Sequence, residues 1–153
     1  MIRHDLSHWP LVLSVARGPS TLAEHDAFLA EWNHWLDRGE RFATLRVFAD
    51  AAALAHPDGA ARGAKAWLQA NAGRLQAQVT AMATVVPPEQ LAPVRRMNAE
   101  KLFGVPAQAF GGIDDALDWL ERVAAPASTW RRDAAAERLR RILGENRPHP
   151  SPP

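Results

Sequence analysis

Four short apolar runs alternate along the chain with longer segments whose apolar residues recur every three or four positions. Apolar runs of this length that end at Gly, Pro or Ser are typical of β-strands, and the longer spacing is typical of amphipathic helices. The predicted strands are residues 9–16, 41–48, 79–86 and 105–110. The predicted helices are residues 21–38, 60–78, 91–103, 114–123 and 128–143. Strand–helix alternation predicts an α/β fold with a single, mostly parallel four-stranded sheet and right-handed crossovers.

Local signals set the element boundaries. Thr21 and Glu24 have capping-box spacing, so a helix should begin at Thr21, and Gly39 should end it. The strand at 105–110 is short and carries a proline near its start, which favours an edge position. We expect a domain over residues 1–126, an added amphipathic helix over 127–144 and a disordered Pro-rich tail over 145–153.

Polar residues alternate with apolar ones along the predicted strands. Thr44 and Arg46 point opposite to Leu45, and Thr80 and Thr84 interrupt the third strand in the same way. A sheet covered on both sides usually has nearly continuous apolar strands. We therefore expect one fully packed face and one face that is partly open or contacts a partner. The expected partner residues are Thr44, Arg46, Thr80, Thr84 and Trp130.

Composition excludes several kinds of site. The chain has no cysteine, which removes disulfides and thiolate chemistry, and its net charge of +1 gives no reason to expect nucleic acid binding. It begins without an apolar signal core and has no apolar run near the ~18–20 residues needed to cross a bilayer, so we expect a cytoplasmic protein. Of its six tryptophans, four have core spacing, and Trp9 and Trp130 are expected where the last helix meets the body.

Ligands of parallel α/β sheets collect beyond the carboxyl ends of the strands. Those loops contain an acid, an imidazole and several guanidinium groups, which suit an anionic ligand or acid–base chemistry. The candidate ligand-binding residues are Arg17, Asp50, His56, Arg62, Arg95 and Arg96. The competing interpretation is that these are solvated loop charges.

No cofactor or metal site is predicted. His4 and His8 would lie together on a helix, but no third ligand accompanies them. His25 is expected to be a hydrogen-bonded, partly buried histidine. No phosphate-binding glycine loop and no distinguishable Ser/His/Asp arrangement occurs, so the catalytic residues are unknown and we lean toward a protein that is not an enzyme.

Three features together resemble the STAS-like proteins, a group that includes bacterial anti-sigma-factor antagonists and the cytoplasmic domains of sulfate transporters. They are Trp-Pro-Leu-Val-Leu at 9–13, Asp50 just past the second strand, and Ala-Leu-Asp-Trp-Leu at 116–120. The resemblance covers about residues 9–123 and implies a regulatory interaction module. The antagonists carry a phosphorylatable serine after the aspartate, but residues 50–67 contain no Ser or Thr here. A phosphoserine switch is therefore not expected.

Two functions follow from these observations. The first is a non-enzymatic STAS-like module that binds a protein partner or a second copy of itself, through the open sheet face or through the arginines of the last helix. The alternative is a small-molecule binding protein, or a small enzyme, that uses the loops at the carboxyl ends of the strands for an anionic ligand. The alternative predicts a concave pocket where those loop residues converge.

Overall fold

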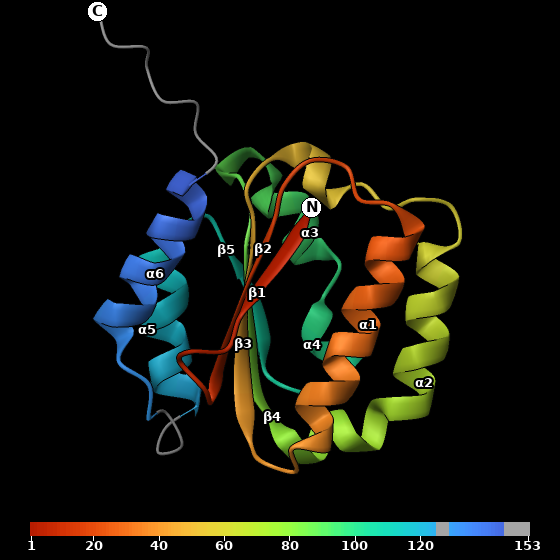
Figure 1. Cartoon of the computed structure of the whole chain (residues 1–153), viewed down its shortest axis with the longest axis horizontal. Coiled ribbons are helices and arrows are strands. Elements are labelled where there is room, and N and C mark those ends of the chain that lie inside the picture. Colours follow the sequence, from red (N-terminus) through yellow and green to blue (C-terminus); the bar gives the residue numbers. More distant parts are fainter. Residues whose placement is uncertain (125–128, 146–153) are drawn as a thin grey trace, which may run out of the picture.

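A five-stranded sheet lies between two layers of helices (Figure 1). The computed structural model describes residues 1–124 and 129–145. The strands, in their order across the sheet, are β1 (Ile2–Asp5), β2 (Leu11–Ala16), β3 (Phe42–Phe48), β4 (Val79–Val85) and β5 (Ala107–Phe110). β2 to β5 run parallel, which confirms the predicted α/β fold and its mostly parallel sheet, and β5 lies at the predicted edge.

The prediction of four strands is wrong by one. β1 pairs antiparallel with β2 and makes the sheet mixed. It was missed because its sequence, Ile-Arg-His-Asp, has a single aliphatic residue. The aromatic surroundings of His4 compensate for this polarity: its ring stacks on Phe28 at 5.4 Å and meets Trp35 edge-on at 5.1 Å.

Helices cover both faces of the sheet. α1 (Leu22–Asp37), α2 (Ala60–Gln78) and the short α4 (Ala99–Phe103) lie on one face, and α5 (Ile113–Ala124) and α6 (Arg132–Glu145) lie on the other (Figure 1). The predicted capping box is present: the Thr21 hydroxyl accepts from the Glu24 amide at 3.1 Å, and the Glu24 carboxylate accepts from the Thr21 amide. Two short 3₁₀ turns, η1 (Ala51–Leu54) and η2 (Pro88–Gln90), follow β3 and β4.

The expectation of a partly open sheet face is wrong. Aromatic and aliphatic side chains of α1 and α2 close that face over Val12 and Phe42. Thr44 is 7% exposed, and Arg46, Thr80 and Thr84 are half-buried under the helices. These four side chains therefore do not form an exposed partner surface. The polar residues of the strands were interpreted as a sign of an exposed face. The sequence of a strand does not show whether helices such as α1 and α2 pack over it.

One predicted helix is two. Residues 91–103 form α3 (Leu91–Arg96) and α4, separated at Asn98, which has a positive φ of 47°. Asparagine tolerates this left-handed conformation, and its side chain accepts from the Lys101 amide at 3.3 Å. The backbone turn and the new N-cap together end one helix and begin the next.

The last helix joins the body through Trp130. This side chain is 9% exposed and belongs to the core cluster formed with α5 and the sheet, so it is not free to form part of a partner face. Trp9 does not share that seam: it stacks on Phe42 at 5.1 Å in the cluster of the opposite face, and its indole N–H donates to Glu40 at 2.7 Å. The break expected at 124–127 and the tail at 145–153 fall largely outside the described residues.

Candidate functional site

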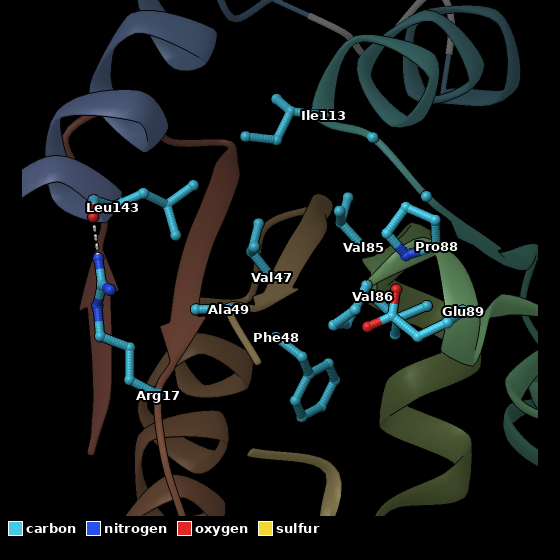
Figure 2. Close-up of a pocket in the computed structure, with 13 residues that line it drawn as sticks. Arg17, Val47, Phe48, Ala49, Val85, Val86, Pro88, Glu89, Ile113 and Leu143 are labelled. Atoms are coloured by element: carbon cyan, nitrogen blue, oxygen red, sulfur yellow. Dashed lines mark hydrogen bonds between the residues drawn. The ribbon is translucent and has the colours of Figure 1, made fainter. Parts of the chain in front are cut away.

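A cleft of about 600 Å³ opens at the carboxyl ends of β3 and β4, on the side of the sheet that α5 and α6 cover (Figure 2). Its walls are mostly apolar, and its charged lining residues are Arg17 and Glu89. The lining also includes Phe48, Val86, Pro88 and Ile113. A concave site was expected here, but of the six candidate ligand-binding residues the cleft includes only Arg17.

Arg17 and Asp50 hold the chain together at this edge. Nη2 of Arg17 donates to the carbonyl oxygens of Ile142, at 3.0 Å, and Leu143, so its positive charge lies at the C-terminus of α6 (Figure 2). Asp50 caps η1 by accepting from the Ala53 amide at 2.9 Å, and both of its carboxylate oxygens accept from the Gly18 amide at 3.1 Å. Arg17 and Asp50 therefore have structural roles, because their side chains connect neighbouring segments of the chain.

The remaining candidates are dispersed. Both Nε and Nη2 of Arg95 donate to the Ala109 carbonyl of β5, at 3.1 and 3.0 Å. Arg62 is exposed on α2 and Arg96 is exposed on α3. His56 instead meets His25 of α1 at 5.5 Å between ring centroids. The predicted set does not converge on one cavity.

A row of polar side chains crosses the sheet on the opposite face. The strand register aligns His4 with Ser14, Ser14 with Arg46, and Arg46 with Thr84. His4 Nδ1 lies 2.7 Å from the Ser14 hydroxyl oxygen. Ser14 is 5% exposed, and the row lies in the half of the sheet nearer the carboxyl edge. Four adjacent strands therefore present hydroxyl, imidazole and guanidinium groups along one line.

Arg46 is the charged centre of this row. Its guanidinium carbon lies 4.3 Å from the ring centroid of Phe28 and 4.5 Å from that of Phe48. Its Nε is buried and has no hydrogen-bond partner. Within residues 1–124 and 129–145 no carboxylate forms an ion pair with it. Burial lowers the pKa of Arg46 to about 10, which leaves the side chain charged at neutral pH.

Two histidines, His4 and His25, lie close enough to this arginine for its charge to act on them. Burial lowers the pKa of His4, and Arg46 acts in the same direction, whereas Glu31 opposes it. Burial also lowers the pKa of His25, with further lowering by His56 and Arg46 and opposition from Glu24 and Asp26. Burial, together with the positive charge of Arg46, thus favours the neutral forms of His4 and His25.

The expectation for His25 was a hydrogen-bonded histidine. The structure places its half-buried ring against that of His56 instead. His4, considered earlier as half of a metal pair with His8, lies on a strand and contacts Ser14. In the described part of the chain, no group of three or more metal-ligating side chains comes together.

The arginines of α6 are engaged within the chain. Arg132 pairs with Asp118 at 2.5 Å, Arg138 with Asp5 at 2.6 Å, and Arg140 with Asp114 at 2.9 Å. Arg141 pairs with Glu137 one turn away at 2.9 Å. These carboxylates neutralise much of the positive charge that the sequence places on the last helix.

A signal for the polar row exists in the sequence. Ser14, Arg46 and Thr84 each precede two apolar residues that end a strand segment, Val-Ala, Val-Phe and Val-Val respectively. Because parallel neighbours pair in register, equal distances from the carboxyl end predict one line across the sheet. The contribution of His4 was not predictable in this way, because β1 itself was missed.

Comparisons with known proteins identify no family. No family model matches the chain, and neither the curated proteins nor the solved structures give a significant match. None of the helices that the structure describes has the length and apolar character needed to cross a membrane. The assignment of function therefore depends on the site itself.

Proposed function

We propose that this chain is a binding module for a small anionic ligand, and that Arg46 is the residue that holds it. The observation that carries the proposal is a partly buried guanidinium with an unpaired Nε and no carboxylate partner among the described residues. A buried charge is costly unless something compensates it. Phe28 and Phe48 compensate only in part, because ring faces attract a cation without accepting its hydrogen bonds as an anion does.

The groups beside Arg46 suit an oxyanion. Ser14 and Thr84 lie in register on either side of it, and hydroxyls can donate to an anion. Arginine binds carboxylate, phosphate and sulfate groups through paired N–H donors. Arg46 lies in a central strand, so a ligand would have to reach it from the carboxyl edge, between the strand ends and the start of α1.

The resemblance to the STAS-like proteins supports binding rather than catalysis, and it enters here as part of the proposal. The sheet of β2 to β5 with its alternating helices is compatible with such a domain, and residues 9–13 and 116–120 carry the resemblance. Fold-level analogy does not convey an activity, so the anion site depends on its own chemistry.

Sulfate is a suitable probe because its charge is constant near neutral pH. We expect isothermal titration at low ionic strength to give saturable sulfate binding to the wild type. Arg46→Met should weaken it by at least about tenfold, since a charged hydrogen bond contributes about 1.5–3 kcal/mol. Arg38→Met is the matched control, because Arg38 also lies over an aromatic ring, that of Trp9 at 4.2 Å, but is exposed. Equal affinities in the wild type and Arg46→Met would refute the proposal.

A protein-binding function remains a second proposal. Exposed apolar side chains favour it: Met97 is 72% exposed after α3, and Leu102 is 61% exposed on α4. If these residues mediate self-association, light scattering should detect a dimer that Leu102→Glu dissociates. A wild-type monomer at all accessible concentrations would exclude self-association through this surface.

A further inference from the structure

Two histidines meet at the start of α1, one turn from Phe28, whose ring lies against Arg46. α1 begins at the carboxyl edge of the sheet and runs away from it, so His25 lies one turn nearer that edge than Phe28 (Figure 1). His56 lies on the connection between η1 and α2, which also starts from this edge. The two imidazole rings meet at 5.5 Å with an angle of 67° between their planes. Two titratable side chains from different elements thus meet one turn of α1 away from the ring that contacts Arg46.

We propose that His25 and His56 couple anion binding to proton uptake, so that at mildly acidic pH the site prefers a doubly charged oxyanion such as sulfate over a singly charged one. This inference rests on the proposed function of Arg46 and adds the class of ligand and its regulation. Arg46 supplies one permanent positive charge, which matches a monocarboxylate. Each protonated imidazole adds another, and an incoming dianion brings the charge that stabilises both protonated rings.

The surrounding charges permit this response. Without a ligand, burial lowers the pKa of His25, and the positive neighbours His56 and Arg46 lower it further. Glu24 and Asp26 act in the opposite direction. The Glu24 carboxylate accepts a hydrogen bond from the Thr21 amide and pairs with the N-terminal ammonium at 3.1 Å. The hydrogen bond from the Thr21 amide lowers the pKa of Glu24, so this carboxylate stays ionised at mildly acidic pH.

His4 also feels the charge of Arg46, and its contacts differ from those of His25 and His56. It is enclosed by Phe28 and Trp35, and its Nδ1 contacts the Ser14 hydroxyl. Protonation of this ring is opposed by burial and by Arg46, and is favoured by Glu31. Proton uptake by His4 would persist when His25 and His56 are replaced. Replacing these two residues therefore distinguishes a response of His4 from the proposed response of His25 and His56.

The test is the pH dependence of sulfate affinity in the wild type and in a His25→Gln/His56→Gln variant. In the wild type, the affinity should rise by about tenfold or more between pH 7.5 and 5.5, because an adjacent opposite charge shifts a pKa by about one unit or more. The double variant should bind with an affinity that is nearly independent of pH. His34→Gln, an exposed histidine on the same helix, should retain the wild-type dependence.

Other oxyanions test the ligand class. At pH 5.5, sulfate should bind more tightly than the monoanion methanesulfonate, and the difference should shrink in the His25→Gln/His56→Gln variant. Wild-type sulfate binding that does not change with pH, or an unchanged pH dependence in the double variant, would overturn this inference while leaving the Arg46 site intact. Absence of sulfate binding at every pH would overturn both proposals.

Discussion

Replacing Arg46 with methionine should stabilise the fold while removing the anion site. Burial lowers the pKa of Arg46 from its usual value to about 10, which corresponds to roughly 3 kcal/mol of destabilisation at about 1.4 kcal/mol per tenfold change. The two cation–π contacts, with Phe28 and Phe48, return about 1 kcal/mol each. Methionine has a similar length, carries no charge and packs well against aromatic rings. The net gain should be about 1 kcal/mol, or about 2–4 °C in Tm for a chain of this size.

Thermal unfolding followed by circular dichroism, in a buffer free of sulfate and phosphate, measures this effect. Arg38→Met provides the control for removing a cation from an aromatic ring at an exposed site, and its Tm should change little. A fall in Tm of more than about 4 °C for Arg46→Met would mean that the guanidinium stabilises the folded chain by about 1 kcal/mol or more. The reasoning that Arg46 is held at a cost to stability would then be refuted.

Three further predictions concern the residues around the site. Asp50→Ala should lower the free energy of unfolding by about 1–2 kcal/mol, because the cap on η1 is lost, and should leave the sulfate affinity unchanged. A loss of sulfate affinity at unchanged stability would instead make Asp50 a ligand-binding residue. Burial alone would raise the pKa of Asp5, but hydrogen bonds from Ser7 and Arg138 together lower it, so its stabilising contribution is present above the unfolded pKa and is lost as the pH falls below about 4. Asp5→Asn should reduce that acid-dependent loss in urea unfolding series, and an unchanged pH profile would contradict the assignment. Gly104→Ala should lower Tm, because φ is 71°, a left-handed conformation that strains a residue with a Cβ; an unchanged Tm would contradict that strain.

The parallel strands and most of the helices could be predicted because their signals are local. β2 and β3 are apolar segments bounded by turn residues, and the capping box of α1 requires only Thr21 and Glu24. β1 could not be predicted, because the surroundings that accept its polar sequence come from α1. The break at Asn98 could not be predicted, because the residues on both sides of it continue one helical pattern.

The site was harder to predict because its residues act over long sequence separations. Arg17 contacts carbonyl groups 125 and 126 residues away, and no local pattern distinguishes that role from ligand binding. The polar positions that contain Arg46 and Thr84 were identified correctly. Their interpretation as an open surface failed because it depended on whether α1 and α2 cover the same face.

The central claim is that an anion binds at the guanidinium group of Arg46. The most direct test is a sulfate titration followed in ¹H–¹⁵N spectra of the arginine Nε–H groups, with the Arg46 signal identified by its absence in Arg46→Met. We expect that signal to shift saturably, and further than those of the other arginines. If it stays in place while signals from exposed arginines move, sulfate binds elsewhere and the claim is wrong.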